Sequence, residues 1–149
     1  MTASLPLTCM GRIIAIDYGT KRCGLAVTDP SRIIATALET VPTHQLVDYL
    51  RKYMATEVVD QIVIGEPKRL NNTDSETTRL ALLFENQLQK TFPEKKICRY
   101  DERLTSKMAQ RSLIESGQSK KVRRDKTVLD RVSATILLQD YLISLANNP

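Results

Sequence analysis

Three acidic residues stand where a sheet protein can assemble a site for a divalent cation. Asp17 ends an apolar, β-branched segment that predicts a strand, Glu102 ends another such segment, and Asp130 lies near the start of the last predicted helix. A carboxylate at the end of a buried strand loses hydration, which a cation or hydrogen bonds must offset. Because carboxylate oxygens are the ligands that hard cations prefer, the three residues are a candidate metal site.

The spacing alone leaves other roles open for these carboxylates. Asp17 starts an Asp-x-Gly turn, in which an Asp side chain commonly satisfies its own backbone. Because side chains alternate along a strand, Asp101 and Glu102 point to opposite faces, and only one of them readily shares a site with Asp17. The pattern of residues does not decide which one.

Structural interpretations exist for the other two carboxylates as well. Glu102 can form an ion pair with Arg99 or Arg103, which are its close neighbours in sequence. Asp130 follows Thr127 by three residues, so that the two can form a helix capping box favoured by the helix dipole. Taken singly, the capping box is the simpler interpretation of Asp130.

Basic residues crowd the same regions of the chain. They are Lys21, Arg22, Lys68, Arg69, Arg103, Lys120, Lys121, Arg123 and Arg124. A basic run is usually a solvated loop, but beside carboxylates it supplies the positive charge that binds phosphates around a metal. The net charge of +5 and the pI near 9.2 also favour an anionic partner, with nucleic acid the first candidate.

Length and composition predict one compact domain. The chain has 149 residues, of which 42% are hydrophobic, enough for one sizeable core. We expect a flexible N-terminal leader over residues 1–10 and a single folded domain over residues 11–149. No apolar run approaches the length of a membrane span. Aromatic residues make up only 5% of the chain, so phosphate contacts rather than base stacking must dominate nucleic-acid binding.

The cysteines and the single histidine exclude several kinds of site. Cys9, Cys23 and Cys98 lie far apart without a C-x-x-C motif, which predicts neither a disulfide framework nor a zinc site and favours a cytoplasmic protein. His44 is the only histidine, so a His-rich metal site is excluded and a catalytic triad would depend on this one residue. We expect His44 at the surface, in the first turn of a helix.

Hydrophobic periodicity predicts the elements that must position these residues. They are a hairpin over Gly11–Asp29, a third strand over Ile33–Val41, a helix capped by Thr43, a strand over Asp60–Gly65, a helix between the capping box Thr73–Glu76 and Pro93, a strand over Lys96–Glu102, a short helix from Thr105 to Gly117, and a last helix over about Val128–Leu145. Three consecutive strands followed by alternating helices and strands predict an α/β fold, with a mixed five-stranded sheet and helices on both faces.

Four sequence blocks resemble the signature motifs of a known family. The blocks are Ile16–Asp29, Val63–Pro67, Tyr100–Thr105 and Leu129–Gln139. They resemble the YqgF family, also called RuvX, which has been described both as Holliday junction resolvases and as nucleases of the ribosomal RNA precursor. The resemblance runs from Gly11 to Leu142 in order and without large insertions.

The resemblance implies a ribonuclease H-like, three-layer fold and a nuclease site. It carries the family's acidic triad onto Asp17, Glu102 and Asp130, and thereby favours Glu102 over Asp101. It also implies hydrolysis of phosphodiester bonds in 5′-end maturation of the 16S ribosomal RNA precursor, with cleavage of four-way DNA junctions as the alternative. The chain departs from the family at Glu66, where an apolar residue usually lies between the Gly and the Pro of the second block.

The predicted mechanism uses two Mg²⁺ or Mn²⁺ ions. Asp17 bridges both ions, while Glu102 and Asp130 hold one each, so that one ion activates water and the other stabilises the leaving 3′-oxygen. We expect a nucleic-acid partner, no membrane, and a monomer or homodimer.

Two other classes of function remain open on sequence grounds. A strand–Asp-x-Gly–strand segment also begins the phosphate loop of actin-like ATPases, although those proteins enclose the nucleotide with two lobes. A non-catalytic RNA-binding factor in transcription or ribosome assembly would use the same basic surface, and its binding would survive loss of metal and of the carboxylates.

Overall fold

A computed structural model describes residues 11–66, 76–101 and 126–147. The elements in chain order are β1 (Arg12–Asp17), β2 (Arg22–Thr28), β3 (Ala35–Pro42), the 3₁₀ turn η2 (Thr43–Gln45), α1 (Leu46–Thr56), β4 (Val59–Glu66), α2 (Glu76–Thr91), β5 (Lys96–Asp101) and α5 (Lys126–Asn147). The predicted short helix from Thr105 to Gly117 lies outside the described residues. None of the described helices combines the length and apolarity needed to cross a membrane.

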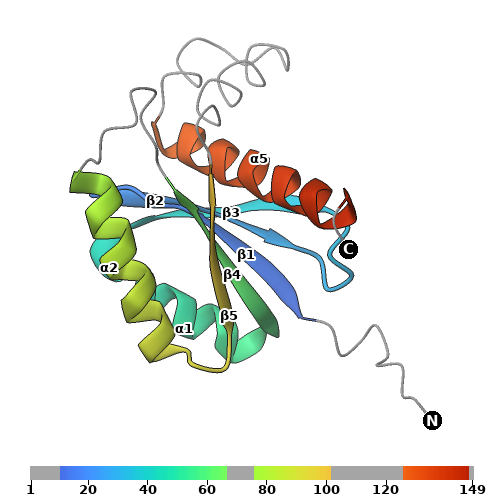
Figure 1. Cartoon of the computed structure of the whole chain (residues 1–149), viewed down its shortest axis with the longest axis horizontal. Helices are drawn as coiled ribbons and strands as arrows, with labels where there is room; N and C mark the ends of the chain where they lie inside the picture. The colour runs from blue at the N-terminus through green and yellow to red at the C-terminus, as the bar shows by residue number, and fades with distance from the viewer. Residues whose placement is uncertain (1–10, 67–75, 102–125, 148–149) are drawn as a thin grey trace.

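The strands form one mixed sheet in the order β3-β2-β1-β4-β5. β1 pairs antiparallel with β2 and parallel with β4, β2 pairs antiparallel with β3, and β4 pairs parallel with β5. Helix α5 covers one face of the sheet, and α1 and α2 cover the other (Figure 1). The predicted mixed five-stranded sheet with helices on both faces is confirmed.

Strand β1 contributes to two separate cores because its side chains alternate between the faces. Ile14 and Ile16 pack in the cluster that includes α1 and α2, whereas Ile13 and Ala15 pack in the cluster under α5. All four side chains are completely buried. The continuous apolar run of β1 is therefore the run expected of a central strand covered on both faces.

The third strand starts later than its apolar sequence predicts. Ile33 and Ile34 were predicted to open it, but they belong to the preceding turn and are 74% and 62% exposed. The Asp29 carboxylate accepts hydrogen bonds from both of their backbone N–H groups, at 2.8 Å each. A side-chain acceptor in the turn therefore competes with the strand, which begins at Ala35.

The predicted capping role of Thr43 is wrong. Thr43 lies in η2, α1 begins only at Leu46, and the residues before either helix make no side-chain capping hydrogen bond. The Thr43 hydroxyl donates instead to the Gly19 carbonyl oxygen at 2.7 Å. Thr43 thus joins the start of the helical layer to the turn between β1 and β2.

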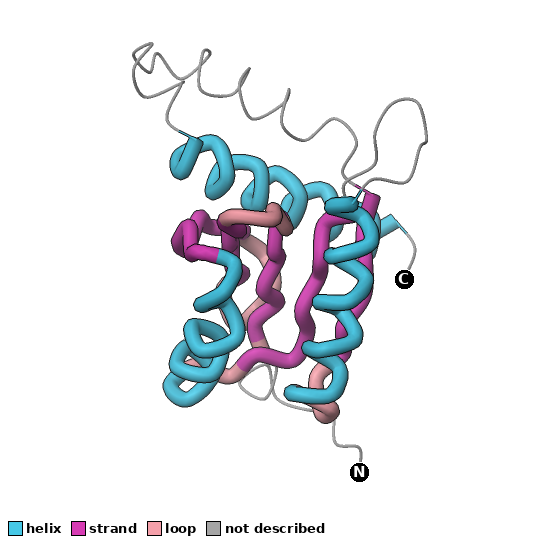
Figure 2. The backbone as a smooth tube through the Cα atoms, turned by 90° about the vertical axis from the view of Figure 1, so that its left-hand side faces the viewer, coloured by secondary structure: helices cyan, strands magenta, loops and turns pink. Residues whose placement is uncertain are grey.

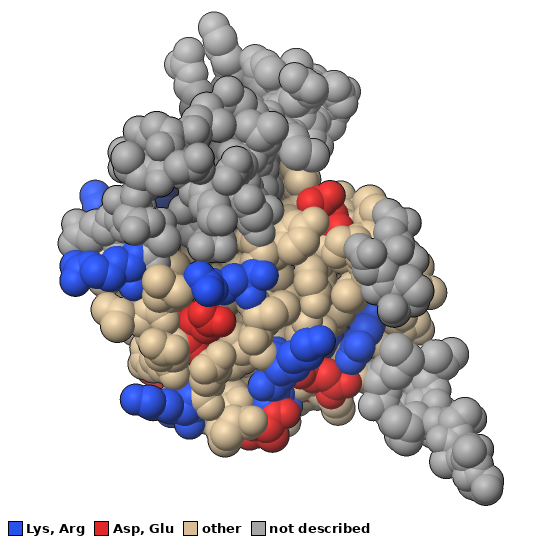
Figure 3. Space-filling model, viewed as in Figure 1, with Lys and Arg blue, Asp and Glu red and all other residues tan. Residues whose placement is uncertain are grey.

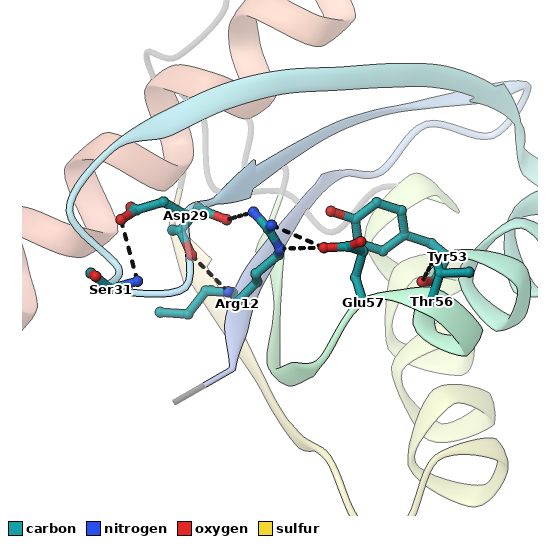
Figure 4. Close-up of polar contacts among 8 residues, drawn as sticks. Arg12, Asp29, Ser31, Tyr53, Thr56 and Glu57 are labelled. Carbon is teal, nitrogen blue, oxygen red and sulfur yellow. Dashed lines mark hydrogen bonds and ion pairs between the residues drawn. The ribbon is translucent and has the colours of Figure 1, made fainter. Parts of the chain in front are cut away.

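Arginine and carboxylate side chains fasten the amino-terminal end of the sheet (Figure 4). Arg12 pairs with Glu57 at 2.9 Å, between Nη2 and Oε1, and donates from Nη1 to the Thr28 carbonyl oxygen at 3.0 Å. Beside it, the Asp60 carboxylate accepts from the Gly11 backbone N–H at 2.7 Å and pairs with Arg32 at 2.8 Å. These contacts tie β1 to β2 and to both ends of the α1–β4 connection.

The turn after β2 makes stability depend on pH. Hydrogen bonds from the backbone N–H groups of Ile34, Ile33 and Ser31 hold the pKa of Asp29 below its ordinary value. The stabilisation is therefore fully present above the pKa that Asp29 has in the unfolded chain, about 3.9, and is lost as pH falls below it. We expect Asp29→Ala to lower the free energy of unfolding at pH 7, measured by urea denaturation. The difference from the parent should shrink towards pH 3, and a difference independent of pH would contradict this account.

Candidate functional site

Asp17 lies at the carboxyl end of β1, between two glycines. The register pairs Asp17 with Gly24 of β2 on one side and with Gly65 of β4 on the other. The same row continues to Thr40 of β3 and to Tyr100 of β5. Neither adjacent position on β2 or β4 therefore carries a side chain beside Asp17.

Asp17 belongs to the face of the sheet that α5 covers. Ile13 and Ala15 pack in the cluster under α5, and alternation places Asp17 on the same face at the end of the strand. The residue is half-buried, in contrast to the four completely buried residues before it. Its carboxylate therefore lies at the boundary between the buried core and solvent.

Helix α5 begins over the same end of the sheet. Arg131, next to Asp130, pairs with Glu39 of β3 at 3.7 Å between Nη1 and Oε1. Glu39 is in register with Leu25, which is in register with Ile16, one row before Asp17. The ion pair thus holds the helix turn that carries Asp130 near the row of Asp17.

The structure describes the predicted acidic triad only in part. Asp17 is fully described, and the backbone of Asp130 lies in α5, but the Asp130 side chain and all of Glu102 lie outside the described residues. β5 ends at Asp101, directly before Glu102. Within the described ranges, no three His, Cys, Asp or Glu side chains form a group that would hold a metal ion.

The structure bears on the capping box predicted for Asp130 and on the Arg99 side chain predicted to pair with Glu102. Helix α5 begins at Lys126, two residues before the predicted start, so Thr127 lies inside the helix rather than before it. Arg99, a predicted partner of Glu102, pairs with Glu85 of α2 at 3.0 Å between Nε and Oε1, and Glu102 itself lies outside the described residues.

Of the predicted basic residues, two lie in the described part of the chain. Lys21 is exposed in the turn between β1 and β2, and Arg22 opens β2. The other seven are outside the described residues: Lys68, Arg69, Arg103, Lys120, Lys121, Arg123 and Arg124. Figure 3 shows Lys and Arg side chains towards the left-hand border of the molecule, the side on which α2 begins in Figure 1.

The β1–β2 turn is held rigidly in place. A Cβ added to Gly19 would lie 2.5 Å from the Arg22 carbonyl oxygen, so this close approach requires glycine. Thr43 donates from its backbone N–H to the Lys21 carbonyl oxygen at 3.0 Å, in addition to its hydroxyl bond to Gly19. These contacts hold the backbone of the turn, from which the Lys21 side chain is exposed to solvent.

The other face of the sheet carries a pocket that the sequence analysis did not predict. A cavity of about 520 Å³ opens between α1 and α2, which stand side by side in Figure 2. Its lining residues are Tyr18, Thr43, His44, Val47, Asp48, Arg51, Leu80, Leu83, Phe84, Gln87 and Thr91. The Tyr18 and Phe84 rings pack with centroids 5.3 Å apart, and burial, with a smaller effect of Cys23, raises the pKa of Tyr18. His44 is at the surface as predicted, but it lines this pocket.

Substitution of Gly19 tests the rigidity of the turn. We expect Gly19→Ala to displace the turn, because the new methyl group meets backbone, and to cost about 1–3 kcal/mol in the free energy of unfolding. Affinity for nucleic acid should fall as Lys21 moves. Gly11→Ala is the matched control, because its Cβ would meet Asp60 at 2.6 Å at the opposite end of the sheet. Equal loss of binding in both variants, measured by fluorescence anisotropy, would contradict the specific role of the turn.

Known proteins resemble the chain along nearly its whole length. The sequence matches the RuvX family, described as Holliday junction resolvase, over residues 11–144. A protein of Flavobacterium johnsoniae is 50% identical over 135 residues, which cover 91% of this chain and 98% of that protein. A protein of Porphyromonas gingivalis is 53% identical over 133 residues, which cover 89% of this chain and 96% of that protein. Both relatives carry the name "Putative pre-16S rRNA nuclease".

Among solved structures, T. thermophilus RuvC in complex with a Holliday junction substrate is similar in fold. The TM-score is 0.55 at 14% identity, and the match covers 93% of this chain and 97% of that chain. This likeness confirms the predicted ribonuclease H-like fold. The match over residues 11–144 and the two close relatives together show that the chain belongs to the RuvX family.

Proposed function

We propose that the chain is a metal-dependent nuclease whose site is built from Asp17, Glu102 and Asp130. The observation that carries this proposal is the position of Asp17 at the end of the central strand, on the face covered by α5. The ion pair between Arg131 and Glu39 brings the start of α5 over the same end of the sheet, which supports Asp130 as the second ligand.

The packing of β5 supports Glu102 as the third ligand. Cys98 and Tyr100 pack in the cluster under α5, so the even-numbered positions of β5 share the face of Asp17. Glu102 is the next even position in the sequence and Asp101 is an odd one, which favours Glu102 as the partner of Asp17.

The donor set fits a hard divalent cation such as Mg²⁺ or Mn²⁺. Three carboxylates would supply oxygen ligands, and the positions beside Asp17 on both neighbouring strands are glycines, which add no competing side chain. When bound, such ions lower the pKa of the attacking water and stabilise the leaving oxygen of a phosphodiester. Asp17, on the central strand, would hold the metal together with Glu102 and Asp130, while Lys21 and Arg22 would bind neighbouring phosphates.

We propose the 5′ end of the 16S ribosomal RNA precursor as the substrate. The relatives' name supports this choice, since both are about half identical to the chain over nearly their whole length. The description of the family supports the second candidate, a four-way DNA junction. The basic turn and the high pI serve either substrate, because both offer the same phosphates. We further propose that residues 11–149 form the nuclease domain, that the protein acts in the cytoplasm, and that it works as a monomer or homodimer.

Asp17→Asn tests the nuclease and its substrate together. We expect cleavage of a 5′-extended 16S RNA fragment with Mg²⁺ or Mn²⁺ to fall by at least about 10³-fold, because the amide loses the charge that holds the ions. The far-ultraviolet circular dichroism spectrum should be unchanged. Asp140→Asn is the matched control, since Asp140 lies further along α5 and accepts a hydrogen bond from Tyr100, which an amide oxygen also accepts.

Cleavage that persists in Asp17→Asn, or in the parent with chelator, would contradict the proposed mechanism. Cleavage of a four-way DNA junction but not of the RNA would replace the proposed substrate with the second candidate. Binding of both without cleavage of either would point to a non-catalytic RNA-binding factor.

Glu39→Gln tests whether the ion pair with Arg131 positions Asp130. A pair whose side chains are 34% and 49% exposed contributes at most about 1 kcal/mol to folding. We nevertheless expect the affinity for Mn²⁺, measured by titration calorimetry, to fall by up to about 5-fold, the factor that corresponds to about 1 kcal/mol. Glu57→Gln breaks the pair with Arg12 at the opposite end of the sheet and is the control. Equal metal affinity in the two variants would contradict a positioning role for Glu39.

A further inference from the structure

The pocket between α1 and α2 has no part in the proposed metal site. It lies on the face of the sheet opposite to Asp17, since Tyr18 and Phe84 belong to the cluster that contains both helices. Its volume of about 520 Å³ lies within the range of small-ligand sites. The pocket is therefore large enough to bind a small ligand, and the proposed cleavage reaction gives it no role.

The lining of the pocket is amphipathic. Five of the eleven lining residues are apolar or aromatic: Tyr18 and Phe84 are buried, at 9% and 6% exposure, whereas Leu83 is 55% exposed. The other six are polar or charged and come from both helices and from η2. A groove that binds a protein helix is lined mainly by apolar side chains, so this balance favours a ligand with a flat apolar body and a polar edge.

The charges and hydrogen-bonding groups of the lining further restrict the class of ligand. Arg51 and His44 supply donors for a phosphate, and Asp48 and Gln87 supply acceptors for the amino groups of a base. Arg51 and Asp48 face each other on α1 at 3.7 Å, and their side chains are 60% and 76% exposed. Solvent-exposed groups of both signs beside the exposed apolar side chain of Leu83 match a nucleotide, which carries a phosphate, a base edge and an apolar base face.

The pocket is joined to the metal site through the β1–β2 turn. Thr43 lines the pocket, and its backbone N–H and hydroxyl bind the carbonyl oxygens of Lys21 and Gly19. Tyr18, also in the lining, follows Asp17 directly, and consecutive Cα atoms are about 3.8 Å apart. The pocket and the proposed metal site are therefore connected through this one turn of the chain.

From these observations we propose that the pocket is a nucleotide subsite, which binds one nucleotide of the strand whose phosphodiester bond lies at Asp17. The proposal rests on the proposed nuclease function and adds a second contact on the opposite face of the sheet. It assigns Arg51 to a phosphate of this nucleotide and Gln87 to the edge of its base. The subsite contributes to substrate affinity and to base preference rather than to the chemical step.

The first test measures nucleotide binding without cleavage. Nucleoside 5′-monophosphates with each of the four bases are titrated into ¹⁵N-labelled Asp17→Asn protein in the presence of chelator. The expected result is a set of saturable amide shifts at Thr43, His44, Arg51 and Gln87, with one base binding most tightly. Shifts confined to the β1–β2 turn, or no saturable shift, would overturn the subsite. Because chelator removes metal and a nucleoside monophosphate has no phosphodiester bond to cleave, this outcome is independent of the nuclease proposal.

The second test measures cleavage by the otherwise unchanged protein. We expect Arg51→Ala and Gln87→Ala each to raise KM for the RNA fragment about 10-fold with kcat nearly unchanged, because the subsite binds ground state and transition state alike. Lys52→Ala and Gln89→Ala are matched controls, since both residues are exposed on the same helices outside the pocket lining. Equal KM values in the pocket and control variants would overturn the proposal, whereas inactivity of the parent protein would contradict the nuclease function instead.

Discussion

The rest of the structure depends on the burial of β1 at the centre of the sheet. The strand pairs with β2 on one side and β4 on the other, and four consecutive residues, Ile13 to Ile16, are completely buried. A strand enclosed in this way admits a charged group only at its ends. At the amino end, Arg12 meets Glu57 and the β2 backbone; at the carboxyl end, Asp17 emerges between two glycines.

Side chains alternate along β1, so consecutive residues at its carboxyl end point to opposite faces of the sheet. Asp17 belongs to the face of α5 and Tyr18 to the face of α1 and α2. One turn, fixed by the close approach at Gly19 and by two hydrogen bonds from Thr43, lies between them. The proposed carboxylate site and the pocket therefore lie at the same edge of the sheet without sharing a side chain.

Much of this fold could be predicted from the sequence because buried strands and amphipathic helices leave clear patterns. The apolar runs of β1 and β4 and the helical spacing of Leu80, Phe84 and Leu88 predicted the elements and their layers. The start of β3 could not be predicted in the same way. Ile33 and Ile34 have side chains typical of strands, but their backbone N–H groups donate to the Asp29 carboxylate. The pattern of apolar residues contains no information about these hydrogen bonds.

Only the part of the candidate site that depends on a single strand could be predicted from the sequence. Asp17 could be placed because it ends an apolar run, and the row of glycines beside it emerged only from the register of β2 and β4. Thr43 looked like a helix cap, yet its hydroxyl bonds to a turn 24 residues earlier in the chain. The pocket was missed for the same reason, since its lining comes from segments far apart in sequence.

The central claim is that Asp17, Glu102 and Asp130 converge on divalent metal at the carboxyl end of β1. The most direct test is a crystal structure of the protein with Mn²⁺, with anomalous data collected at the manganese absorption edge. The account predicts anomalous density within coordination distance of the Asp17 carboxylate, on the α5 face, with Asp130 and Glu102 as further ligands. Manganese bound elsewhere, with Asp17 making only protein contacts at saturating metal, would contradict it.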